Sequence, residues 1–112
     1  MKKLGDRGED LAACYLSKKG FVIIERNWRC ARGEIDIIAK DGDTLVFVEV
    51  KTRRTDRLGT PTEAVNIKKQ QKLRLLARHY IYENKKTAST YRFDVAAVNG
   101  RTNEVTLITN AF

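Results

Sequence analysis

The sequence has little of what several classes of protein require. It contains only two cysteines, Cys14 and Cys30, which indicate neither a disulfide framework nor a zinc site, so we expect free, buried thiols in a reducing cytoplasm. No apolar run approaches the roughly 20 residues of a membrane-spanning helix, so no membrane partner is expected. The one histidine, His79, has no paired Asp or nucleophile, and the chain lacks the Gly-rich loop of a nucleotide-binding turn.

The composition that remains indicates one folded, basic domain. Hydrophobic residues make up 42% of the 112 residues and there is a single proline, which fits one globular domain over residues 1–112. Lys51 to Lys86 holds eleven basic and three acidic residues, and this segment alone accounts for the net charge of +8. Such an excess favours a polyanionic partner, most often nucleic acid; a solvated basic helix face is the alternative.

A β-hairpin is predicted in the middle of the chain. Residues 34–39 and 45–51 alternate in polarity on either side of the turn Asp41-Gly42-Asp43. In a hairpin symmetric about Gly42-Asp43, residue i pairs with residue 85 − i. One face is then purely apolar and consists of Ile35, Ile37, Ala39, Val46, Val48 and Val50. The opposite face carries Glu34, Asp36, Glu49 and Lys51.

The charged face of this hairpin places two carboxylates opposite each other. Asp36 and Glu49 would have Cβ atoms about 4.5–5.5 Å apart, a distance at which like charges are destabilising, so we interpret the pair as ligands of a divalent cation. Lys51 projects from the same strand face as Glu49, where it can orient a water or offset charge on a phosphate. The trio fits metal-dependent attack of water on a phosphodiester. A solvated sheet face with alternating charges is the alternative.

Two further carboxylates have open assignments. Glu9 lies beside the apolar stripe of a predicted helix, where it could reach the metal from across the sheet, or could be a boundary charge favoured by the helix dipole. Glu34 faces Lys51 under the predicted register, and an ion pair between them would compete with the catalytic role of Lys51.

The other segments predict two helices and three more strands. A helix over residues 5–19 ends at Gly20, and a short strand over 21–24 follows. A second helix runs to about Tyr82, and begins either after a capping box at 60–63 or at Asn66. Strands over 91–98 and 104–109 turn at Asn99-Gly100, and Trp28 is assigned to the core. The order α-β-β-β-α-β-β gives an α/β domain with a small mixed sheet flanked by helices.

Basic residues next to the carboxylates predict a surface for nucleic-acid phosphates. A loop follows the hairpin, and loops commonly carry such contacts. The expected contacts are Arg29, Lys51, Arg53, Arg54, Arg57, Lys68, Lys69 and Lys72.

Several of these residues occur in motifs of known families. Asp36 followed by Glu49-Val50-Lys51 resembles the active-site signature of the PD-(D/E)xK nuclease superfamily, with Ile35 in place of the usual Pro before the Asp. Over nearly the whole chain the motifs resemble the YraN-like family of small bacterial proteins. These motifs are Gly5-Asp6-Arg7-Gly8-Glu9, Asn27-Trp28-Arg29, Gly33-Glu34-Ile35-Asp36, Phe47-Val48-Glu49-Val50-Lys51-Thr52-Arg53, Lys69-Gln70 and Arg92-Phe93-Asp94.

The resemblance implies a restriction-endonuclease-like fold related to Holliday-junction resolvases. It implies that Asp36 and Glu49 are metal ligands, that Lys51 is the catalytic lysine and that Glu9 is a helix-borne carboxylate of the metal site. Gln70 would point into the site from the second helix.

Three hypotheses about function follow. The first is an endonuclease dependent on Mg²⁺ or Mn²⁺ that hydrolyses DNA, with branched or junction DNA as the substrate class and a homodimer as a compatible assembly. The second is a nucleic-acid-binding module without catalysis on a nuclease scaffold. The third is a protein–protein adaptor.

Overall fold

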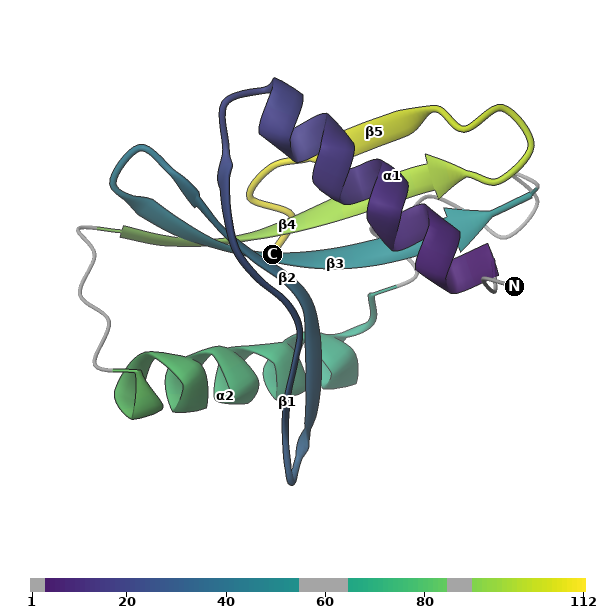
Figure 1. Ribbon diagram of the computed structural model, residues 1–112. Helices are drawn as coiled ribbons and strands as arrows, with labels where there is room; N and C mark the ends of the chain where they lie inside the picture. Colours follow the sequence, from purple (N-terminus) through teal and green to yellow (C-terminus); the bar gives the residue numbers. More distant parts are fainter. Residues whose placement is uncertain (1–3, 55–64, 85–89) are drawn as a thin grey trace.

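The fold follows the element order that the sequence predicts. A computed structural model of the chain describes residues 4–54, 65–84 and 90–112, with the side chains of residues 4–6 left out. The elements in chain order are α1 (Leu4–Lys18), β1 (Val22–Cys30), β2 (Gly33–Asp41), β3 (Thr44–Arg53), α2 (Ile67–Glu83), β4 (Thr90–Asn99) and β5 (Val105–Ile108) (Figure 1). The α/β class and the order α-β-β-β-α-β-β are therefore confirmed. None of the described helices is long and apolar enough to cross a membrane.

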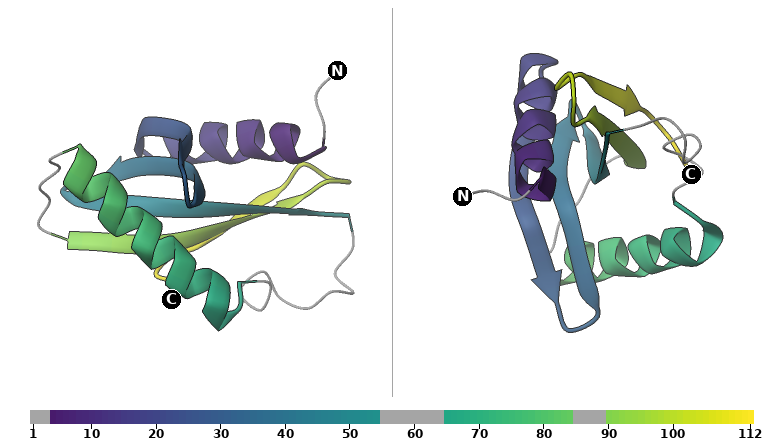
Figure 2. Two further views of the ribbon diagram at one scale, coloured as in Figure 1. Left: turned by 90° about the horizontal axis from the view of Figure 1, so that it is seen from below. Right: turned by 90° about the vertical axis from the view of Figure 1, so that its right-hand side faces the viewer.

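The five strands form one mixed sheet that is covered on both faces. The strand order is β1-β2-β3-β4-β5, and only β3 and β4 run parallel, which requires the crossover that contains α2. Figure 2 shows α1 on one face of the sheet and α2 on the other. Each helix packs its apolar side on a separate cluster, with Leu16 of α1 on one side and Leu73, Leu76 and Tyr80 of α2 on the other.

The register of the central hairpin agrees with the sequence prediction. Partners from Ile37↔Val48 to Asp41↔Thr44 follow the rule of 85 − i, because the tight turn at Gly42 (φ +60°) fixes how the strands align. The paired residues end at Ile37↔Val48. Beyond this point β2 pairs only with β1, and β3 continues beside β4, so the two strands separate (Figure 1).

The first strand differs from the prediction. β1 extends to Cys30, not only over 21–24, because Glu25, Arg26 and the segment from Trp28 to Cys30 pair with β2. The pairing shifts by one residue between Ile23 and Glu25, and Asn27 has a left-handed backbone (φ 54°). Such irregularities interrupt the alternation that identifies a strand in a sequence, and they bend the ribbon.

The purely apolar face predicted for the hairpin is wrong in one respect. Ile35 packs with Trp28 and Phe47 in the α2 cluster, whereas Ile37 belongs to the α1 cluster. The bend of the β1–β2 ribbon carries Ile35 to the other side of the sheet. Trp28 is buried, as predicted, and contacts Tyr80 edge to face.

The ends of both helices match local sequence signals. Gly20 follows α1 with a positive φ, and Asn66 caps α2 by accepting a hydrogen bond from the Lys69 N–H (2.9 Å). The Asn66 alternative is therefore confirmed, whereas the capping box at 60–63 lies outside the described residues. Both thiols are free as expected, but neither is buried: Cys14 is exposed and Cys30 is half-buried.

A buried ion pair connects β4 to the C-terminal segment. Asp94 is fully buried and accepts two hydrogen bonds from Arg92 and a third from the backbone N–H of Asn110. Arg92 also donates to Asp41 across the sheet (3.1 Å). These contacts raise the pKa of the Arg92 guanidinium. The Arg92-Phe93-Asp94 motif therefore stabilises the fold.

Close contact between Gly8 of α1 and Thr52 of β3 leads to a stability prediction. A Cβ at Gly8 would lie 1.9 Å from Thr52 Oγ1. We expect Gly8→Ala to lower the free energy of unfolding by about 1–3 kcal/mol, as overpacking does, although Ala alone favours a helix by about 1 kcal/mol over Gly. Urea unfolding measures the change. Thr52→Ala should restore part of the loss, and Ser17→Ala is the matched control on the exposed side of α1. A Gly8→Ala protein more stable than the parent would contradict the close contact.

Candidate metal site at the strand fork

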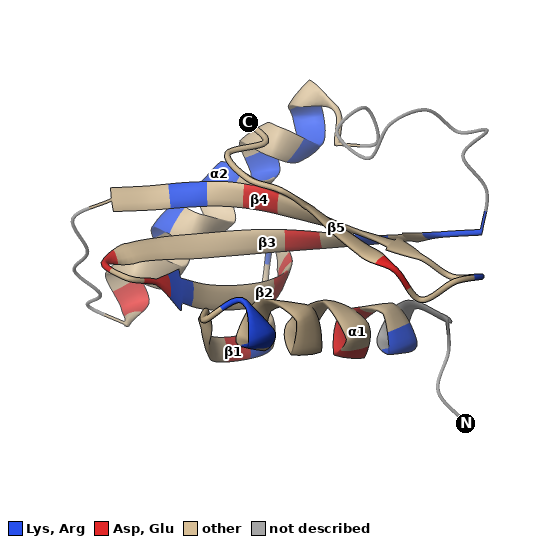
Figure 3. Ribbon diagram, turned by 90° about the horizontal axis from the view of Figure 1, so that it is seen from above, with Lys and Arg blue, Asp and Glu red and all other residues tan. Residues whose placement is uncertain are grey.

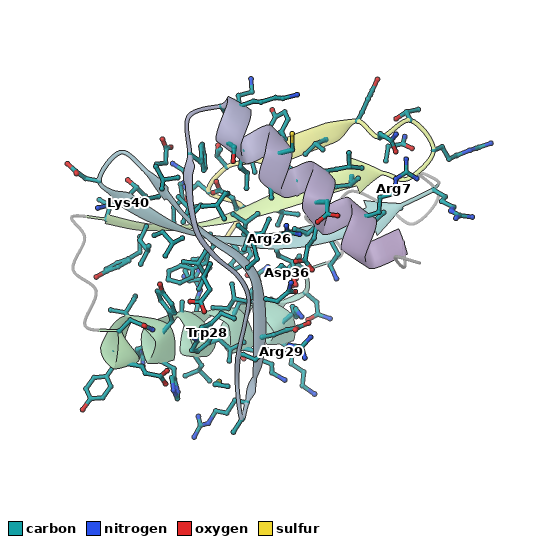
Figure 4. The ribbon with its side chains drawn as sticks, viewed as in Figure 1. Arg7, Arg26, Trp28, Arg29, Asp36 and Lys40 are labelled. Carbon is teal, nitrogen blue, oxygen red and sulfur yellow. The ribbon has the colours of Figure 1, made fainter. Side chains whose placement is uncertain are left out.

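The predicted carboxylates meet where β2 separates from β3. Asp36 directly precedes the last paired residue of β2, and Glu49 directly follows its partner on β3. The N-terminal half of α1 lies on one side of this fork and the first turn of α2 on the other, so side chains from four elements converge there. Figure 4 labels Asp36 on β2 and Arg26 on β1, and Arg26 pairs with Ile37, the residue that follows Asp36. We call Asp36, Glu49 and Glu9 the carboxylate cluster.

Asp36 is held by the backbone of the neighbouring strand. Its Oδ2 accepts a hydrogen bond from the Val50 N–H (2.8 Å), which satisfies a backbone donor that the separating strand β2 no longer reaches. Burial raises the pKa of Asp36 to about 8, together with a hydrogen bond to Glu49 and repulsion by that carboxylate; the Val50 bond acts in the opposite direction, and Glu9 adds further repulsion. Without a cation, the cluster therefore retains a proton on Asp36 near neutral pH.

Glu49 is buried and faces a cation from α2. Lys69 Nζ lies 3.2 Å from Glu49 Oε2, and the side chain of Glu49 is only 8% exposed. The contact lacks hydrogen-bond geometry, so Glu49 Oε2 accepts no hydrogen bond from the part of the chain that the structure describes. A buried carboxylate oxygen that accepts no hydrogen bond raises the free energy of the folded state, and a bound cation would remove that penalty.

Glu9 approaches the cluster from α1, which is the placement that the resemblance implies and one of the two that the helix pattern leaves open. Its side chain is 12% exposed, and its charge acts on Asp36. Arg26 on β1 lies 2.7 Å from Asp10 and 3.9 Å from Glu9, so one guanidinium draws these two neighbouring acidic side chains of α1 towards the sheet.

The other predicted catalytic residues are placed differently. Lys51 is half-buried on β3, and its ammonium makes no ion pair with a described residue. Gln70 donates to the carbonyl of Val65 (2.8 Å), which holds the residue before α2 in place. Glu34 pairs with Arg29 of β1 (2.9 Å), so the proposed pairing with Lys51 is not observed.

The residues predicted to bind nucleic acid form more than one group. Lys68 and Lys72 lie exposed on α2, Lys69 joins the carboxylate cluster, and Arg29 is engaged by Glu34. Arg53 and Arg54 end β3, and Arg57 lies outside the described residues. Figure 3 shows basic positions along α2 and at the end of β3.

The donor set fits a hard divalent cation that keeps much of its water. Within the described residues no three acidic, His or Cys side chains are arranged to hold a metal ion together, so a full protein cage is not formed. Mg²⁺ usually takes only one or two carboxylates and retains several waters. Asp36 and Glu49, with a donor-less buried oxygen on Glu49, meet that requirement.

Two contributors to the site were not identified from the sequence. Arg26 lies in a segment whose bulged pairing concealed a strand, and Lys69 was assigned to phosphates rather than to Glu49. The Asn66 cap could have identified Lys69 as a site residue. The cap determines where α2 begins, and the first residue of a helix determines which side chains of its first turn point to the sheet.

The raised pKa of Asp36 predicts a pH dependence of stability in metal-free protein. The folded pKa (about 8) exceeds the unfolded value of 3.8, so the folded state binds the proton more tightly. This contribution is complete below about pH 4 and is lost as the pH rises towards 8, by up to about 1.4 kcal/mol for each pH unit. Denaturant unfolding in a chelator at several pH values should show this loss, and Asp36→Asn should abolish it. Equal pH dependence in both proteins would contradict the assignment.

Comparisons with known proteins agree with the motifs. The family described as "Uncharacterised protein family UPF0102" matches residues 8–98. A UPF0102 protein of Rhodococcus opacus is 56% identical over 95 residues, covering 85% of this chain and 80% of its own length. A UPF0102 protein of Caldicellulosiruptor saccharolyticus is 44% identical, and the match covers 99% of this chain and 98% of that protein. A UPF0102 protein of Alkaliphilus metalliredigens is 49% identical, and the match again covers 99% of this chain and 98% of the relative. The chain therefore belongs to the UPF0102 family, which is the YraN family.

Proposed function

We propose that this protein is a metal-dependent endonuclease that hydrolyses phosphodiester bonds in DNA. The observation that carries the proposal is the pair of half-buried Asp36 and buried Glu49 at the strand fork, with Lys69 beside it. Two neighbouring carboxylates, one half-buried and one buried, are unfavourable for a structural purpose alone, since the negative charge of each raises the free energy of the other. Perturbed groups of this kind are typical of functional sites.

Each residue of the site has a role in this reaction. A divalent cation bound by Asp36 and Glu49 would supply a Lewis acid and lower the pKa of a bound water. The Val50 N–H fixes the orientation of Asp36, and Arg26 keeps Glu9 close to the cluster. Lys51 extends from the same strand as Glu49 with its ammonium available to a phosphate oxygen, where it would offset charge developing in the transition state.

The basic residues around the fork favour a polyanionic substrate. Lys68 and Lys72 on α2 and Arg53 and Arg54 at the end of β3 all follow Glu49 in the sequence, and phosphate contacts supply most non-specific affinity for DNA. Branched or junction DNA is the substrate class that the nuclease resemblance implies, and a homodimer would present two sites to such a substrate.

A cleavage panel tests this proposal. Labelled duplex, single-stranded and four-way-junction DNA is incubated with the protein in Mg²⁺, in Mn²⁺ and in a chelator. We expect cleavage only with metal, and Asp36→Asn or Glu49→Gln should lower the rate at least 100-fold, beyond the roughly 10–100-fold effect of residues that only support metal ligands.

The matched control for these variants is Glu104→Gln. Glu104 is an exposed carboxylate before β5, so its removal changes the net charge equally without touching the fork. Metal-independent cleavage, or equal rates in the Asp36→Asn and Glu104→Gln proteins, would refute the enzymatic proposal.

A nucleic-acid-binding module without catalysis is the second candidate function. The contact between Lys69 and Glu49 favours it, because the lysine neutralises the same oxygen that a cation would take. This function predicts binding that weakens with salt, needs no metal and survives loss of Asp36 and Glu49.

Lys69→Gln separates the two candidates. If a cation and Lys69 compete for Glu49 Oε2, removing the ammonium should increase the melting-temperature shift caused by Mg²⁺, since a ligand that binds the folded state more tightly stabilises it more. Thermal unfolding with and without Mg²⁺ measures this shift. An unchanged response to Mg²⁺ in the Lys69→Gln protein would favour the non-catalytic module.

A further inference from the structure

A second concave site lies beside the carboxylate cluster. A cavity of about 280 Å³ opens between the β1–β2 turn and α2. Its lining consists of Arg32, Lys68, Gln71, Lys72, Leu75 and Leu76. Small-ligand sites usually measure about 300–1,000 Å³. The cavity lies just below this range, which fits a single monomer unit and excludes a folded partner.

The charge around this cavity is of one sign. Arg32, Lys68 and Lys72 are exposed, and none makes an ion pair with a described residue. Lysines in the first turns of α2 oppose the helix dipole, and like charges four residues apart repel each other. The only acidic residue of α2 is Glu83 at its far end. An anion in the cavity would relieve this repulsion.

The cavity also has an apolar floor. Leu75 is 49% exposed and Leu76 is buried, and both line the cavity. Inorganic phosphate has no apolar part that could cover such a surface. A group that combines a phosphate with a flat, apolar base or sugar matches both parts of the lining.

The position of the cavity connects it to the strand fork. Gly33 of β2 is in contact with Lys72, since a Cβ added at Gly33 would lie 3.1 Å from Lys72 Cε. Gly33 and Asp36 are three residues apart on β2, roughly 10 Å along the strand. On α2, Lys69 reaches Glu49, while its neighbours Lys68 and Lys72 face the cavity. A nucleic-acid strand at the fork could therefore place an adjacent nucleotide in the cavity.

We propose that this cavity binds one nucleotide of a single-stranded nucleic-acid segment next to the carboxylate cluster. Its phosphate contacts Arg32, Lys68 and Lys72, and its base or sugar covers Leu75. The inference rests on the proposed function for its ligand class, and it names which part of the substrate the chain recognises: an unpaired segment.

Binding measured in a chelator tests the cavity independently of catalysis. A labelled single-stranded 12-mer is titrated with the parent protein, Arg32→Gln, Lys72→Gln and Leu75→Gln. Each charge variant should weaken binding several-fold and reduce the slope of log affinity against log salt by about 0.7. Leu75→Gln should weaken binding without changing that slope.

Lys40→Gln is the matched control, because Lys40 is an exposed cation at the opposite end of β2 (Figure 4). It should leave binding close to that of the parent. Urea unfolding confirms that each variant folds. Poly-glutamate of equal charge is the counter-probe.

Three outcomes would overturn the inference: Arg32→Gln and Lys72→Gln proteins that match Lys40→Gln, a Leu75→Gln protein that binds like the parent, or poly-glutamate that binds as tightly as the oligonucleotide. Failure of the proposed function looks different. In that case the oligonucleotide still binds through the cavity residues, but none of the DNA substrates is cleaved when metal is present. That result would support the cavity and reject the nuclease.

Discussion

The hydrogen bond from the Val50 N–H to Asp36 is the interaction on which the site depends. It joins β2 to β3 at the point where their backbone pairing ends, so the separation of the strands leaves no unsatisfied donor there. The separation in turn opens the sheet to side chains from both helices, and Glu9 and Lys69 approach from opposite faces. A carboxylate placed one residue earlier or later would miss the Val50 N–H.

The electrostatics of the fork favour a cation without enclosing one. Asp36 keeps a proton because it is buried beside Glu49, and Lys69 partly neutralises Glu49 from α2. The retained proton and the lysine each offset part of the negative charge at the fork, and a divalent ion would neutralise more of that charge. The basic residues of α2 then provide contacts for a polyanion next to that excess, which is the arrangement a phosphodiester substrate requires.

The sequence predicts the parts of the site that local rules control. The turn at Gly42 fixes the register and so the neighbourhood of Asp36 and Glu49, and the Asn66 cap sets the start of α2. It could not predict the bend of β1, because bulged pairing leaves no regular alternation. Contacts between distant elements were missed for a different reason: the partner of Lys69 depends on how α2 packs across the sheet.

A crystal of the protein grown with Mn²⁺ tests the central claim most directly, since anomalous scattering locates the ion without assumption. The account predicts a peak between the carboxylates of Asp36 and Glu49, with Lys69 Nζ displaced from Glu49 Oε2. Its absence in an Asp36→Asn crystal grown in the same solution would complete the result. A fork with no peak at saturating Mn²⁺, and with the Lys69–Glu49 contact intact, would contradict the account.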